Sequence, residues 1–115
     1  MPDAPKTVTP GSDDAMRLLR VARTLITEES AWTKGAYSMP DGRRCAIGAL
    51  RAATDWRPRR QMEKWRAHRC LLDVAQASGY PSVERMNDQV SHADMLAAFD
   101  AAIALAATRS TSGRA

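Results

Sequence analysis

The amino-acid sequence predicts an all-α protein, an irregular bundle of about four helices with a structured loop between the first and second helices. Alanine dominates the apolar residues, there is one phenylalanine, and β-branched residues are sparse, which favours helix over strand. Apolar residues recur three and four positions apart, the spacing of one helix face. With 115 residues, 44% of them hydrophobic and 26% charged, the chain is typical of one globular domain.

The predicted domain covers residues 12–107, between disordered tails over 1–11 and 108–115. Its first helix is expected over about Asp13–Thr27. Ser12 is a favourable N-cap, and the acidic residues that follow it suit the positive end of the helix dipole. The core face of this helix is expected to comprise Ala15, Leu18, Leu19, Ala22, Leu25 and Ile26.

Residues 28–44 are predicted to form an irregular loop. Pro40–Gly42 is a turn signal, because proline presets φ and glycine accepts a positive φ. Large apolar side chains in a loop usually lie against the core. In this loop they are Trp32, Tyr37 and Met39.

The next segment, Cys45–Thr54, is predicted to be the buried central helix, because its small side chains let neighbours approach the backbone closely. A longer helix is expected over about Pro58–Ser78, since proline suits a first turn and Gly79 suits a helix end. The apolar face of this longer helix is expected to comprise Met62, Trp65, Leu72 and Ala75, flanked by Leu71 and Val74.

The last third of the domain is predicted to contain one further long helix. Ser82–Met86 is expected to form one short turn, and Asn87–Asp88 a turn or a cap. Ser91 followed by Asp94 resembles a capping box, which predicts a helix over about His92–Ala107. The core face of that helix is expected to comprise Met95, Leu96, Phe99, Ile103 and Ala106.

Several short motifs follow one another along the chain. They are Trp32, Gly35-Ala36, Cys45, Gly48-Ala49-Leu50, Asn87-Asp88 and, in the last helix, Ala101-Ala102-Ile103. In order and spacing they resemble a family of small uncharacterised proteins of actinobacteria, other bacteria and phages, a domain of unknown function. The resemblance covers about Ala15–Ala107 and implies a single helical domain without an established activity. Trp56–Arg60 makes the middle of this chain more basic than the resemblance implies.

The net charge of +4 is concentrated in the middle of the chain. Residues 43–69 hold nine arginines and lysines against two acidic residues. The residues expected to bind a partner are Arg43, Arg44, Arg57, Arg59, Arg60, Lys64, Arg66 and Arg69. A basic segment with tryptophans could bind nucleic acid or another polyanion, whereas the alternative is a solvated face. Because Trp65 is expected on the core face and no nucleic-acid reader is evident, a protein partner is preferred.

A second candidate is a pocket. Its expected residues are Trp32, Tyr37, Cys45, Asn87 and Asp88. A helix N-terminus next to Cys45 would favour an anion there, assisted by Arg43 and Arg44. The preferred interpretation is structural: Trp32 fills the core, the small residues allow close helix packing, and the Asn-Asp pair caps a helix or holds a loop.

Cys45 is also a weak candidate nucleophile, with His68 or His92 as its base. That chemistry needs a base within hydrogen-bond reach and an oxyanion site, and the sequence shows neither. Paired cysteines or histidines at zinc-binding spacing do not occur either. No metal and no cofactor are therefore expected.

The expected function is a non-enzymatic protein-binding or regulatory module in the cytoplasm. No apolar run reaches the roughly 20 residues needed to cross a bilayer, so no membrane partner is expected. Residues 1–12 lack the apolar stretch of a secretory signal, and the two cysteines fit a reducing compartment. The alternatives are nucleic-acid or other polyanion binding through residues 57–69 and a small thiol-dependent enzyme that uses Cys45.

Overall fold

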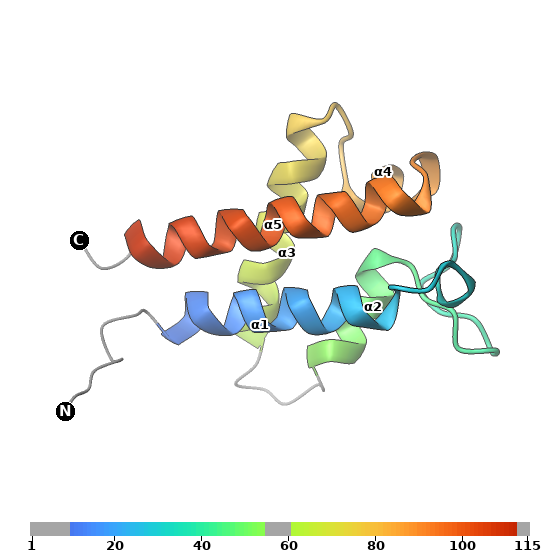
Figure 1. Ribbon diagram of the computed structural model, residues 1–115, viewed down its shortest axis with the longest axis horizontal. Helices are drawn as coiled ribbons and strands as arrows, with labels where there is room; N and C mark the ends of the chain where they lie inside the picture. Colours follow the sequence, from blue (N-terminus) through green and yellow to red (C-terminus); the bar gives the residue numbers. More distant parts are fainter. Residues whose placement is uncertain (1–9, 55–60, 113–115) are drawn as a thin grey trace.

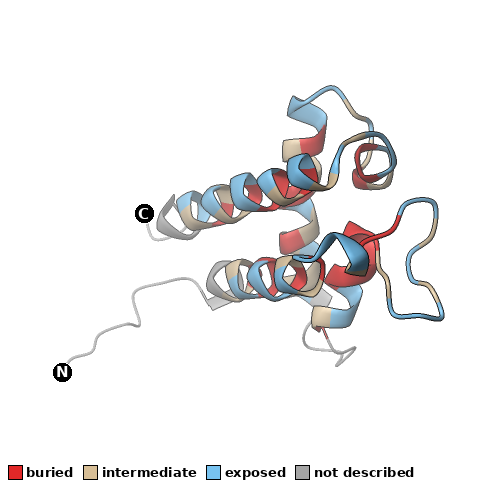
Figure 2. Ribbon diagram, turned by 45° about the vertical axis from the view of Figure 1, so that its right-hand side comes forward, coloured by how far each residue is buried: buried red, intermediate tan, exposed pale blue. Residues whose placement is uncertain are grey.

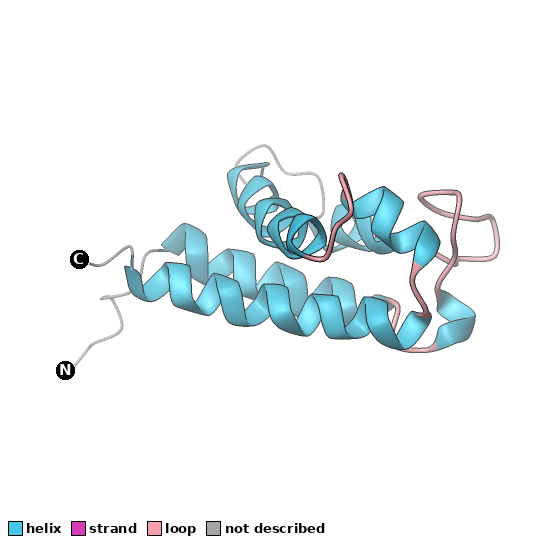
Figure 3. Cartoon of the chain, turned by 90° about the horizontal axis from the view of Figure 1, so that it is seen from above, coloured by secondary structure: helices cyan, strands magenta, loops and turns pink. Residues whose placement is uncertain are grey.

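The computed structural model describes residues 10–54 and 61–112. Two long helices, α1 (Pro10–Leu25) and α5 (His92–Ser112), lie side by side and run in opposite directions (Figure 1). A third long helix, α3 (Gln61–Ala77), crosses both of them on one side of the pair (Figure 1, Figure 3). The long helices therefore form two layers, and the core lies where they cross.

Two short helices and a loop complete the domain. α2 (Ala46–Thr54) packs against α1 and α3, and α4 (Val83–Gln89) contacts α2 and α3. The loop between α1 and α2 contains a short 3-10 helix, η2 (Glu29–Ala31), and isolated backbone bridges at Arg44. No strand occurs in the described residues, so the predicted all-α fold is confirmed.

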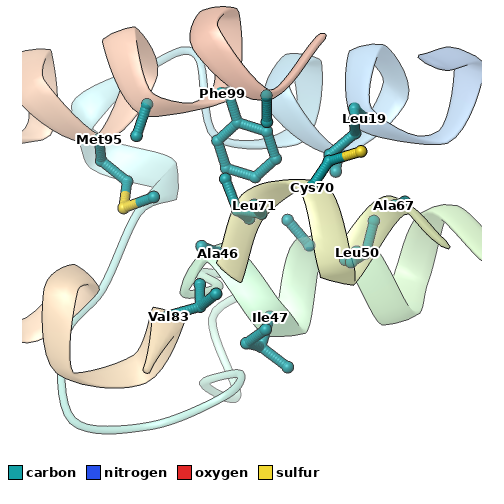
Figure 4. Packing of buried hydrophobic residues seen from close by; sticks show 14 of the residues in the cluster. Leu19, Ala46, Ile47, Leu50, Ala67, Cys70, Leu71, Val83, Met95 and Phe99 are labelled. Atoms are coloured by element: carbon teal, nitrogen blue, oxygen red, sulfur yellow. The ribbon is translucent and has the colours of Figure 1, made fainter. Parts of the chain in front are cut away.

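The core is built from one face of each long helix. Phe99 of α5, Leu19 of α1 and Leu71 of α3 are fully buried where the helices meet (Figure 4). Buried positions face neighbouring helices, and the outer sides of the same helices are exposed (Figure 2). The predicted core faces of the first and last helices are confirmed, with only Leu25, Leu96 and Ile103 partly buried.

The described residues contain five α-helices rather than about four. Residues 83–89 form a helix where one short turn was predicted. Ser82 caps it, because its hydroxyl accepts a hydrogen bond from the backbone N–H of Arg85 at 3.1 Å. Asn87 and Asp88 consequently lie inside a helix and not in a turn.

Several helix ends also differ from the prediction. α1 begins at Pro10, inside the predicted tail, and ends at Leu25. α5 continues to Ser112, so residues 108–112 of the predicted tail are helical. Arg109 pairs with Asp73 of α3 at 2.5 Å, a tertiary contact beyond the end of the apolar pattern. Residues 1–9 and 113–115 of the predicted tails, and the predicted helix start at 58–60, lie outside the described residues.

The predicted core face of α3 is wrong in the first half of the helix. Met62 and Trp65 are 57% and 59% exposed. The buried positions are Ala67, Cys70, Leu71 and Ala75. Small side chains on this face let α3 cross the α1–α5 pair closely. Apolar residues occur on two sides of this helix, and only packing selects one of them.

Candidate functional site

Asn87 is the polar centre of the contact between α4, α2 and the loop. Its side chain is fully buried. Its Oδ1 accepts hydrogen bonds from the indole Nε1 of Trp32 at 2.7 Å and the backbone N–H of Ala46 at 3.0 Å. Its Nδ2 donates to the carbonyl of Thr33 at 3.0 Å. Because Ala46 is the first residue of α2, Asn87 caps that helix from another element. We call these four residues the Asn87 junction.

The rest of the loop is held by two further hydrogen bonds from α4. The Asp88 carboxylate accepts one from the backbone N–H of Gly35 at 2.8 Å. The Tyr37 hydroxyl donates one to Glu84 at 3.2 Å. Gly35 has a φ of 78°, in the region that glycine adopts most easily. The interpretation of the Asn-Asp pair as a cap and a loop anchor matches these bonds, although both residues act from within α4.

Gly48 allows the loop backbone to touch α2. A Cβ atom at this position would lie 1.8 Å from the carbonyl oxygen of Tyr37. The same carbonyl accepts a hydrogen bond from the backbone N–H of Cys45 at 3.2 Å. The small-residue segment thus serves close packing, which is the structural interpretation given to it from sequence.

A pocket of about 220 Å³ opens beside the Asn87 junction. Its lining residues are Gly35, Ala36, Tyr37, Cys45, Glu84, Asn87 and Asp88. Four of the five predicted pocket residues are among them. The fifth, Trp32, is only 9% exposed and is bonded to Asn87, so it fills the core instead.

The charge of this pocket differs from the expectation. Its ionisable carboxylates are those of Glu84 and Asp88, and neither Arg43 nor Arg44 lines it. Arg43 pairs with Asp41 in its own turn at 2.9 Å. The pocket therefore disfavours the anion that the sequence suggested for it.

Cys45 occupies the N-cap position of α2, directly before Ala46. Its Sγ accepts a hydrogen bond from the backbone N–H of Gly48 at 3.4 Å. Burial raises the pKa of this thiol, and the carboxylates of Glu84 and Asp88 raise it further. The N–H groups of Gly48 and Ile47 lower the pKa, but the net direction is upward. Activated cysteines occupy the opposite, electropositive kind of environment.

Neither predicted base is bonded to Cys45. The His92 ring contacts the carbonyl of Ile26 at 2.7 Å through Nε2, and it lies 5.4 Å from the Trp32 ring. His68 lines a separate hollow beside Trp65. Among the described residues, no three or more His, Cys, Asp or Glu side chains are grouped so that they could hold a metal ion.

The exposed side of α3 is a second candidate site. We call Met62, Lys64, Trp65, Arg66 and Arg69 the α3 face. Trp65 stands between two hollows of about 190 and 470 Å³. The smaller is lined by Ala15, Trp65, Arg66, Arg69, Cys70, Ala106 and Arg109. The larger is lined by Ile47, Leu50, Arg51, Lys64, Trp65, His68 and Glu84.

The cations of the α3 face are only partly neutralised. Asp73 pairs with Arg69 at 3.4 Å and with Arg109 at 2.5 Å. Lys64 and Arg66 have no ion pair within the described part of the chain. The α3 face therefore combines exposed apolar side chains with surplus positive charge.

The structure brings together only some of the predicted binding residues. Lys64, Arg66 and Arg69 lie on the α3 face, whereas Arg43 and Arg44 belong to the loop. Arg57, Arg59 and Arg60 lie outside the described residues. Arg109 beside the smaller hollow was missed because its segment was predicted to be a tail. Arg51 was missed too, and its guanidinium lies 4.3 Å from the centre of the Tyr37 ring.

The fold and these two sites define a small all-α domain with a buried polar junction and an exposed cationic and aromatic face. The chain belongs to DUF6197, a family of unknown function, whose model matches residues 11–105. The predicted membership in a domain of unknown function is confirmed in this form. No curated protein and no solved structure matches the chain. No described helix has both the length and the apolar character to span a bilayer.

Proposed function

We propose that this protein is a non-enzymatic binding module that captures a protein partner through the α3 face. The observation that carries the proposal is the exposure of Trp65 (59%) and Met62 (57%) among arginines. Tryptophan and arginine are the side chains that most often dominate the energy of protein interfaces. A hollow on either side of Trp65 offers space for partner side chains.

The environment of Cys45 supports a role without thiol catalysis. Its pKa is raised by burial, and no imidazole of the described residues is bonded to its sulfur. A nucleophilic thiol requires a base or an electropositive surrounding. The two buried free cysteines also support a reducing location, and we propose the cytoplasm.

Nucleic-acid binding is the second candidate, because the exposed Trp65 has Lys64 beside it in one hollow and Arg66 and Arg69 beside it in the other. Trp65 was expected on the core face of its helix, but it is exposed and could stack on a base. A protein partner is still preferred, because Asp73 neutralises part of the positive charge and because the smaller hollow has an apolar floor. Phosphate recognition needs uncompensated cations along a track.

The experiment compares partner capture by the 115-residue chain and three variants, followed by cross-linking and mass spectrometry. Trp65→Ala and Arg66→Glu should each remove the captured protein, whereas Arg20→Glu should retain it. Arg20 is an exposed arginine of α1 that lines neither hollow. Equal capture by all variants would contradict the proposal.

A salt titration separates the two candidates. Binding to single-stranded or duplex DNA that falls steeply and linearly on a logarithmic salt scale would favour nucleic acid. The proposed protein-binding role predicts no measurable DNA binding at physiological salt.

A further inference from the structure

The smaller hollow beside Trp65 has an apolar floor and a cationic rim. It opens where α1, α3 and α5 meet. Ala15, Cys70 and Ala106 form its floor, each from a different helix. Trp65, Arg66, Arg69 and Arg109 line the rest of the hollow. The Arg109 guanidinium donates a hydrogen bond to the Cys70 thiol at 3.6 Å, so this cation lies directly beside the floor.

The volume of the hollow suits one side chain. At about 190 Å³ it is slightly larger than an apolar protein cavity of roughly 150 Å³ that holds a benzene molecule. One aromatic ring or branched aliphatic side chain therefore fills it. A whole peptide segment does not fit, so the rest of a partner must lie on the rim.

The rim selects for negative charge next to that side chain. Of the three arginines that line the hollow, Arg69 and Arg109 both pair with the Asp73 carboxylate. Arg66 has no ion pair within the described residues. A guanidinium carries five N–H donors in a fork that matches a carboxylate, so Arg66 is free to bind one bidentately.

We propose that the smaller hollow receives one aromatic or branched apolar side chain of an acidic partner segment, and that Arg66 binds a carboxylate next to it. This inference rests on the proposed function and specifies the chemistry of the partner at the same face. Charge complementarity and the apolar floor together exclude a basic or purely polar segment as the occupant.

The test uses the 115-residue chain and three labelled synthetic peptides. One carries glutamates around a central phenylalanine, one has alanine in place of the phenylalanine, and one has glutamines in place of the glutamates. We expect the first peptide to bind with saturable amide shifts at Ala15, Cys70 and Ala106 in NMR spectra. Each of the other two should bind about tenfold more weakly.

Arg66→Gln provides the specific readout. It should weaken the glutamate peptide about tenfold and leave the glutamine peptide unchanged, a coupling that a merely structural role would not produce. Arg20→Gln is the matched control and should change neither affinity. Because Arg66 has no ion pair in the described residues, the variant is expected to fold.

Four results would overturn the inference, and the first three concern the peptides and the protein itself. They are the absence of saturable shifts, equal weakening of both peptides by Arg66→Gln, and self-association that covers Trp65 without peptide. Tighter binding of single-stranded DNA than of the glutamate peptide would also count against it. If partner capture still depends on Trp65 while the peptides do not bind, only this inference fails. If capture is independent of Trp65, the proposed function itself fails.

Discussion

The polar and aromatic groups of the Asn87 junction are buried and hydrogen-bonded, whereas those of the α3 face are largely exposed. At the junction, a fully buried amide satisfies a tryptophan N–H, a helix N-terminus and a loop carbonyl. On the α3 face, another tryptophan is 59% exposed and its arginine neighbour Arg66 has no ion pair in the described residues. One region has its hydrogen-bonding capacity used internally, and the other has it available to a partner.

This contrast shows that distinctive residues need not be functional ones. The tryptophan, the small-residue segment and the Asn-Asp pair of the motif come together mainly to hold the loop against α2. A buried polar group is costly unless it is bonded, so such a junction tolerates few substitutions. The α3 face contains ordinary residue types whose significance comes from their exposure.

The largest expected effect is that of Asn87→Ala. The substitution leaves two buried N–H donors and one carbonyl without partners, and each unsatisfied group costs about 1–3 kcal/mol. We expect a loss of about 4 kcal/mol in the free energy of unfolding, measured by urea denaturation. Asp88→Ala is the matched control, because it removes one exposed hydrogen bond and should cost about 1 kcal/mol. Equal losses would mean that the junction is not the centre of stability.

Gly48→Ala is expected to have the next largest effect. The new Cβ must displace the Tyr37 backbone from α2, which should cost about 3 kcal/mol. Helix propensity alone predicts the opposite sign, a gain of about 1 kcal/mol. Ala52→Gly, at an exposed position of the same helix, measures the ordinary propensity term. A stabilised Gly48→Ala protein would contradict the close contact.

A smaller effect should follow the ionisation of Cys45. Burial raises the pKa of this thiol above its ordinary value of 9.0, so the folded state binds the proton more tightly than the unfolded chain. The resulting stability is complete below that value and is lost as pH rises through the higher folded pKa. We expect Cys45→Ser to lose less stability than the unsubstituted protein as the pH rises above about 9. A thiol reagent that labels Cys45 of the folded protein faster than that of the unfolded chain would contradict this and revive the enzyme hypothesis.

The smallest expected effect is that of replacing Trp65, and it contrasts with the effect of replacing Trp32. Trp65→Ser should change the free energy of unfolding by no more than about 0.5 kcal/mol, because the side chain is mostly exposed. Trp32→Phe, which removes the N–H bonded to Asn87, should cost about 2 kcal/mol. Parallel thermal and urea unfolding of both variants tests this. A strongly destabilised Trp65→Ser protein would place the α3 face in the core.

Much of the fold could be predicted because, in most helices, the spacing of apolar residues agrees with the side that is buried. In α1 and α5 the large apolar residues at helical spacing are mostly buried, as the pattern predicts. In α3 apolar residues occupy two sides, so the prediction placed Met62 and Trp65 in the core and small residues around Ala67 took that place instead. Four residues of one candidate pocket were identified from their unusual types, but the charge of that pocket came from Glu84, which has no local signal.

Sequence patterns were enough to predict the all-α class, the core faces of the first and last helices, and the burial of the Ala46–Leu50 segment, because each depends on neighbours along one helix. Helix packing establishes which helix Asn87 caps, that α5 continues past Ala107, and which side of α3 is exposed. Each of these depends on groups that meet from distant parts of the chain, such as Arg109 with Asp73. The spacing of apolar residues along one helix does not predict contacts between residues that are distant in sequence.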